Sequence, residues 1–321
     1  MPSFIARLRA GLVRLWRTDA PLTAGALLML GVLGACALGL WLDPRSVLGA
    51  PVWLKPAKFA ASIAIYCLTL AWLFGYMPGQ ARTRRLVSWT TVGVLLFEMS
   101  IVGVQAARGT TSHFNVSSPL HTLLWALMGA AVLVQTLSTV AVAVALFRQR
   151  FADHALGWAL RLGLVLTIAG ALLGGLMTRP TEAQLDEMRA GRAQVSGAHT
   201  VGAPDGGPGV PVTGWSREHG DLRVAHFLGL HALQLLPLAA LGLRRTRASE
   251  AQRSRLVFTL AGSHAGLVAI LLWQALRGQP VLAPDASTLA VLVSWLMLSS
   301  ASAWRSLARP ALPRAGAFTL S

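Results

Sequence analysis

The residues best suited to chemistry lie in one stretch of the chain, from Gly214 to Gln234. Charged, imidazole and amide side chains gather there, in and just before an apolar segment long enough to lie in lipid: Arg217, Glu218, His219, Asp221, Arg223, His226, His231 and Gln234. A polar group inside a bilayer costs a few kcal/mol, so such groups mostly mark functional positions. This cluster therefore indicates a functional site where a loop enters a helix.

Two other apolar segments carry polar residues toward the same side of the membrane. Glu98 and Gln105 are seven residues apart, which places them near one helical face, and Arg108 follows at the outer end. The next segment carries a stripe of four residues: His121, Trp125, Met128 and Gln135. His264 stands alone on a later segment, where we expect a hydrogen-bonded packing residue.

These residue types predict a bound redox cofactor. Neutral imidazoles on neighbouring helices are the usual ligands of haem iron, copper and zinc, and a carboxylate can relay protons or complete a non-haem iron site. We expect haem b, copper or iron near the outer face. The predicted metal ligands are His121, His226 and His231. The wider cofactor-binding set is His113, His121, His226, His231, Gln105 and Gln234, and the predicted catalytic residues are Glu98, Arg108 and Arg223.

The spacing of the histidines limits this hypothesis. The sequence contains no HxxxH or HExxH pair. His226 and His231 are five residues apart, so their rings diverge by about 140° on a straight helix. One ion would therefore be bound by His226 or His231 together with His121 or His113.

Two other functions fit the same residues. In a transporter or permease, Glu98, Gln105, His231 and Gln234 would line a cavity, and a collar of arginines would attract a small anion: Arg108, Arg179, Arg217 and Arg223. The same arginines are equally able to pair with Asp205, Glu218 and Asp221. In a sensor or assembly factor, the loop 178–221 would contact a periplasmic protein.

The composition indicates an integral membrane protein. Hydrophobic residues make up 54% and charged residues 12% of the chain, whereas soluble domains have about 25% charged residues. The net charge of +16 lies in short basic clusters between apolar runs, which excludes nucleic acid as the expected partner. Cys36 and Cys67 both lie inside apolar runs, so neither a disulfide framework nor a CxxC motif is expected.

The first apolar run raises a question of processing. The residues Leu33 to Cys36 resemble a lipoprotein cleavage site after an arginine-rich start. Because the apolar run continues through Trp41, we expect a spanning segment, although cleavage or lipidation at Cys36 is left open.

The apolar runs predict an all-α, polytopic transmembrane bundle of about eight helices. The expected spans are 22–42, 57–77, 86–107, 120–147, 156–177, 222–243, 256–276 and 286–304. The chain thus divides into a cytoplasmic amphipathic segment (1–21), five spans (22–177), a Gly/Pro-rich extracytoplasmic loop (178–221), three spans (222–304) and a cytoplasmic tail (305–321).

Arginine clusters on alternate connections predict that both termini are cytoplasmic. We therefore expect a multi-pass protein of the bacterial inner membrane whose polar site faces the periplasm. Thr181 and Gln184 have capping-box spacing for a short helix through about Ala190. Lys55 and Lys58 are expected to extend to the outer membrane interface, and Pro237 is expected to kink the sixth span.

Two blocks of the sequence carry a resemblance. RGTTSHFN (Arg108 to Asn115) and GWSREHGDLRVAHFLGLHALQ (Gly214 to Gln234) resemble an uncharacterised family of bacterial polytopic inner-membrane proteins, which implies a fold but no activity. The layout is also similar to that of haem A synthases, and GGLMTRPT (Gly174 to Thr181) resembles a glycine-rich segment of that family. The paired His motifs of haem A synthases are not evident here, so the likeness is a fold-level analogy.

Overall fold

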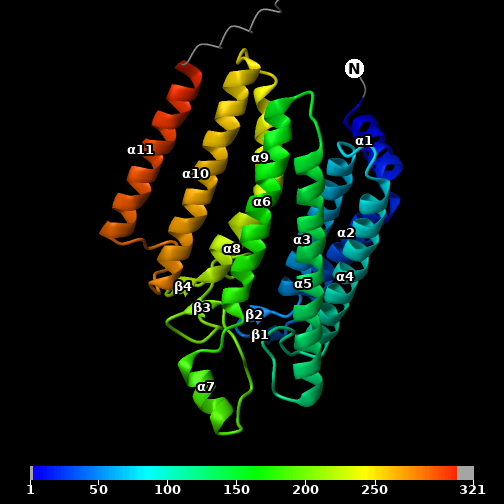
Figure 1. Cartoon of the computed structure of the whole chain (residues 1–321). Helices are drawn as coiled ribbons and strands as arrows, with labels where there is room; N and C mark the ends of the chain where they lie inside the picture. The colour runs from blue at the N-terminus through cyan, green and yellow to red at the C-terminus, as the bar shows by residue number, and fades with distance from the viewer. Residues whose placement is uncertain (1–2, 309–321) are drawn as a thin grey trace, which may run out of the picture.

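The protein is a bundle of long apolar helices with an ordered loop region at one end (Figure 1). The computed structural model describes residues 3–308. Within these residues the helices are α1 (Phe4–Thr18), α2 (Ala20–Leu42), α3 (Leu54–Phe74), α4 (Ala81–Ala107), α5 (Pro119–Arg148), α6 (His154–Met177), α7 (Glu182–Arg189), α8 (Leu222–Leu230), α9 (Ala232–Leu243), α10 (Glu250–Leu276) and α11 (Ala286–Ala308).

Seven helices in the described part of the chain are long and apolar enough to cross a membrane. The pair α8 and α9 forms an eighth span if the two are counted together. The expected all-α polytopic bundle is therefore confirmed. Its last helix continues to Ala308, so the first residues of the tail expected from 305 are helical, and residues 309–321 lie outside the described residues.

The helices pack in two groups. Helices α2 to α5 form one group and α6 with α8 to α11 the other, and α5 and α6 join them (Figure 1). Leucine, alanine and phenylalanine side chains fill the space between helices, with Leu70, Phe74, Leu160 and Leu233 fully buried. The outward faces remain apolar, as expected of helices in contact with lipid.

Both described ends of the chain lie at the same end of the bundle. Helix α1 and the end of α11 are at the top of Figure 1, and α7 with the short strands is at the bottom. An even number of spans requires this arrangement. We call the lower end, which bears residues 178–221, the loop end, and the upper one the terminal end.

The loop 178–221 is fastened to the helices by backbone pairing. Strand β3 (Thr200–Val201) pairs antiparallel with β4 (Gly220–Asp221), and Asn115 forms a bridge with Val195. The predicted short helix is α7, and its capping box between Thr181 and Gln184 is confirmed. A second small hairpin, β1 (Ser46–Val47) with β2 (Ala50–Pro51), closes the α2–α3 connection. The loop is therefore an ordered cover over the helix ends.

The sixth span is broken at His231, where α8 and α9 meet at 45°. The hydroxyl of Thr167 on α6 donates to the carbonyl of Leu230 and accepts the N–H of Leu233, both at 3.1 Å. A side chain thus takes the place of main-chain bonds, which bends a helix. This bend lies six residues before Pro237, which is inside helix α9, and a kink at Pro237 itself stays a prediction.

Candidate functional site

Two lysines turn into the protein beneath the loop. Lys55 and Lys58 are the only lysines among 28 basic residues, and both stand in the first turns of α3. The Lys55 Nζ donates to His113 Nδ1 at 3.2 Å, and the Lys58 Nζ donates to the carbonyl of Thr213 at 2.8 Å. Both ammonium groups thus bind loop residues at the loop end of α3, and their extension to the membrane interface stays a prediction.

His113 is surrounded by aromatic rings, an ammonium group and a hydroxyl group. Its ring centroid lies 5.6 Å from that of Phe59 and 5.4 Å from that of Trp125. Ser112 Oγ is 3.0 Å from the same Nδ1 that Lys55 contacts. Because an ammonium group can only donate, Nδ1 is the acceptor and the proton resides on Nε2.

Glu98 and Gln105 share a buried face of α4, as their spacing predicts. Glu98 is 3% exposed and Gln105 is 1% exposed. In the described part of the chain, Oε1 of Glu98 and Oε1 of Gln105 have no hydrogen-bond partner. Two buried acceptors without donors are unusual in a folded protein and indicate a place where a further ligand or proton binds.

Arg223 is the one member of the predicted arginine collar that is held inside. Its guanidinium pairs with Asp221 and donates to the carbonyl of Gly214 at 2.6 Å. Asp221 also accepts the backbone N–H of Ser216 at 2.8 Å and caps α8. The side chains of Arg108, Arg179 and Arg217 are exposed, so the collar does not form as predicted.

A hydrogen-bonded pair, His199 with Asp205, also fixes the cover. His199 Nδ1 lies 2.6 Å from Asp205 Oδ2, and the backbone N–H groups of His199 and Thr200 donate to the same carboxylate. Burial lowers the pKa of His199 in spite of the carboxylate beside it. Burial alone would raise the pKa of Asp205, but the bonds from His199 and the backbone hold it below its usual value.

These loop groups predict a loss of stability in mild acid. Burial, reinforced by the charge of Lys55, holds the pKa of His113 well below its usual 6.5, and burial lowers that of His199. The unfolded chain therefore binds more protons below pH 6.5, and stability falls by at most about 1.4 kcal/mol per pH unit for each histidine. Thermal unfolding in detergent from pH 8 to pH 5 would measure this.

The double variant H113Q/H199Q should lose most of that dependence. The variant H154Q, at the exposed start of α6, should keep it. Asp205 adds to the effect only in stronger acid, because its contribution disappears below its unfolded pKa. A flat stability between pH 8 and pH 5 in the unmodified protein would contradict this prediction.

The remaining predicted site residues have separate partners. His121 Nδ1 lies 3.4 Å from Ser117 Oγ, and His226 Nδ1 donates to the carbonyl of Gly170 at 2.7 Å. His231 Nδ1 lies 3.3 Å from Gln234 Oε1. The amide of Gln234 in turn reaches Thr69 on α3 at 3.1 Å, so this pair connects the two helix groups near the break between α8 and α9.

His264 is buried and lies 3.0 Å from the carbonyl of Leu228, so its expected role as a satisfied packing residue is confirmed. Among residues 3–308, no group of three or more His, Cys, Asp or Glu side chains is arranged to hold a metal ion. Haem, copper or iron binding stays a prediction.

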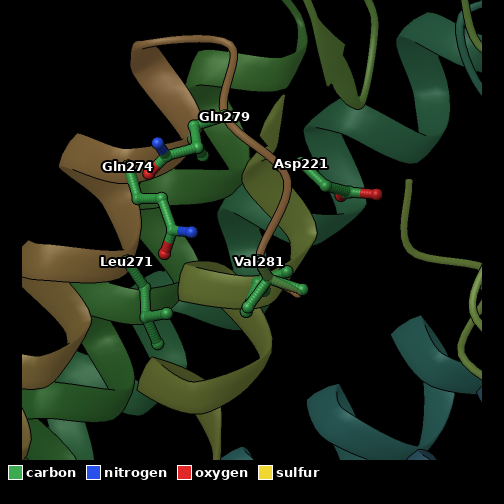
Figure 2. A pocket seen from close by; sticks show the side chains of 7 residues that line it. Asp221, Leu271, Gln274, Gln279 and Val281 are labelled. Carbon is green, nitrogen blue, oxygen red and sulfur yellow. The ribbon is translucent and has the colours of Figure 1, made fainter. Parts of the chain in front are cut away.

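A narrow pocket at the loop end lies beside this region (Figure 2). Gln274 donates to the carbonyl of Pro280 at 2.8 Å, and Gln279 accepts from Thr288 at 2.7 Å. Figure 2 shows Asp221 pointing away from both amides. The pocket is therefore lined by groups that already have partners, and Asp221 serves Arg223 instead.

No protein-family model, curated protein or solved structure matches this chain. Membership of the suspected family therefore stays a prediction.

The site that the structure assembles combines two predicted site residues, His113 and Arg223, with two lysines that were expected at the membrane interface. Beneath the loop, Lys55 contacts His113, and Lys58 and Arg223 donate to the consecutive carbonyls of Thr213 and Gly214. Glu98 lies deeper on α4. We name Lys55, Lys58 and Arg223 the cationic cluster. One signal in the sequence could have found it, namely that a chain using arginine almost everywhere places its two lysines three residues apart at one helix start.

Proposed function

We propose that this membrane protein binds a small oxyanion at the loop end and carries it across the bilayer. The observation that supports this proposal most is that the two lysines lie close together in the chain and neither has a carboxylate partner. Among the described residues, no carboxylate oxygen lies within ion-pair distance of Lys55 or Lys58. Both ammonium groups keep unused N–H donors under a protein cover.

The charges in this region favour an anion. Lys55 and Lys58 repel each other, and Arg223 repels both. Asp221 is committed to Arg223, and Asp205 is committed to His199. Like charges held together in a poorly solvated place are unfavourable, so an anion that neutralises them binds with a large electrostatic gain.

The broken sixth span supports transport rather than binding alone. Discontinuous helices with freed main-chain groups are a recurring feature of transporter substrate sites. Here the break at His231 lies between α6 and α10 and is connected to α3 through Gln234 and Thr69. An element of this kind can bend further without loss of a regular helix, which would open a path inward from the cationic cluster.

The experiment compares anion binding by the full chain in detergent. Trp125 stands beside His113, so the part of the tryptophan fluorescence change that the variant W125F loses reports on the site. Sulfate and acetate are the probes, because they separate an inorganic oxyanion from a carboxylate. We expect the double variant K55M/K58M to weaken binding at least about tenfold, because the loss of even one favourable charge contact has an effect of that size. The variant K55R/K58R keeps the charges and should retain binding.

Flux of the better probe into proteoliposomes then tests transport. The control variant is R179M, which removes an exposed arginine at the loop end and should leave flux unchanged. Equal binding of both probes by the unmodified protein and K55M/K58M would overturn the anion site. Anion binding without flux would show that the protein binds the anion but does not transport it.

A redox protein is the second candidate, and one contact favours it. His226 Nδ1 donates to the carbonyl of Gly170, which leaves Nε2 as a lone-pair donor in the orientation that metal-binding histidines commonly show. A haem or metal bound there would supply electron transfer. An absorption spectrum and metal content of the purified protein test this, and the absence of both a Soret band and stoichiometric metal would remove it.

A further inference from the structure

Glu98 is a buried acid without a committed partner. It is 3% exposed, and its Oε1 accepts no hydrogen bond from any described residue. An ionised carboxylate in such a place is expensive unless a positive charge lies near it. The protonation state of Glu98 therefore depends on whatever cation is within electrostatic reach.

That cation is Lys55. Phe59, one turn after Lys55 on α3, packs against the cluster that contains Val102, one turn after Glu98 on α4, so both charged residues flank the same contact between the two helices and act on each other electrostatically. The other helices packed on α4 place no further charged group near Glu98. Helix α2 has no charged side chain, and the ionisable residues of α5, His121 and Arg148, lie near its two ends. One ammonium group thus serves both Glu98 and the site above it.

Sharing Lys55 links the two sites. An anion bound at Lys55 neutralises the positive charge of the ammonium group. The electrostatic attraction that keeps Glu98 ionised is then lost. A proton from the water beneath the loop converts the carboxylate to a neutral acid, and the anion and proton together add no net charge when the anion is monovalent. By linkage, a proton on Glu98 in turn frees Lys55 for the anion.

We propose that Glu98 is the proton site of a proton–anion symporter, loaded when an anion occupies the cationic cluster. This inference depends on the proposed anion site. Gln105 lies two turns further along the same face with an unpartnered Oε1 of its own. It stands toward the loop end, where a proton would enter.

The test measures proton uptake on anion binding by the full chain in weakly buffered detergent solution. Sodium sulfate is the probe, because sulfate stays fully ionised at neutral pH and exchanges no protons itself. We expect up to one proton to be taken up per bound sulfate, with the largest uptake slightly above pH 7. Sulfate affinity should rise by up to about tenfold for each unit that the pH falls, as one coupled proton requires.

Two variants assign that proton. E98Q mimics the neutral acid, so it should bind sulfate at least as tightly as the unmodified protein, with no proton uptake and no pH dependence. K55R keeps a permanent charge, so it should still take up the proton. Uptake that persists in E98Q, or that disappears in K55R, would place the proton on Lys55 and overturn the inference.

A measurement without variants covers the case in which E98Q does not fold. Infrared difference spectra of the unmodified protein should gain the carbonyl stretch of a protonated carboxyl group when sulfate is added. Sulfate binding with neither this band nor proton uptake refutes the coupling and leaves the anion site intact. Failure of the unmodified protein to bind sulfate or acetate refutes the anion site itself, so the two failures are distinguishable.

Discussion

Replacing Gly170 with valine should prevent stable folding of the second helix group. A Cβ atom at Gly170 would lie 2.5 Å from the carbonyl carbon of Gly229 and 2.6 Å from the nitrogen of Leu230. Both are backbone atoms of α8, so no side chain can rotate away. We expect a loss of more than about 3 kcal/mol in the free energy of unfolding, the upper range for overpacked sites.

Gly175 provides the matched control on the same helix. A Cβ atom there meets nothing within 4 Å, so G175A should be as stable as the unmodified protein or slightly more stable. Thermal unfolding in detergent compares the two variants. If G170V unfolded at the same temperature as the unmodified protein, the close contact between α6 and α8 at Gly170 and Gly229 would be contradicted.

Replacing Asp221 with alanine is expected to have the next largest effect. Asp221 is 1% exposed and holds Arg223, the N–H of Ser216 and the first turn of α8. Its removal would leave a half-buried guanidinium without its partner and α8 without its cap. Breaking one side of a buried ion pair costs roughly 3–5 kcal/mol, and the paired strands β3 and β4 would separate with it.

Asp285 is the matched control, because it pairs with Arg277 in solvent. Exposed ion pairs contribute little, so D285A should unfold much nearer to the unmodified temperature than D221A. Limited proteolysis within residues 178–221 gives a second measurement, since D221A should be cut there faster. Equal unfolding and equal cleavage of the two variants would show that Asp221 does not fasten the loop.

The periodic and apolar features of the chain were predictable from sequence. The eight spans, the helix α7 with its Thr181–Gln184 cap and the inward face shared by Glu98 and Gln105 all depend on contacts within one helix or on burial in lipid. Such features need no knowledge of which helices are neighbours. The burial of His264 was predictable for the same reason.

The break at His231 was not predictable in this way. Pro237 is the visible helix breaker in the sequence, yet the hydroxyl that bends the span belongs to Thr167, more than sixty residues earlier. A threonine in an apolar helix usually bonds to its own helix. Only the packing of α6 on α8, through Gly170 and Gly229, brings it to the break.

By itself, the sequence determined that this protein lies in a membrane as an all-α bundle with polar residues inside it. The tertiary structure decided which of those residues meet: it separated His121, His226 and His231 onto different partners and brought Lys55 and Lys58 under the loop. The physical reason is that hydropathy fixes whether a segment is buried, whereas the neighbour of each polar group depends on how helices and loops pack across long separations in the chain.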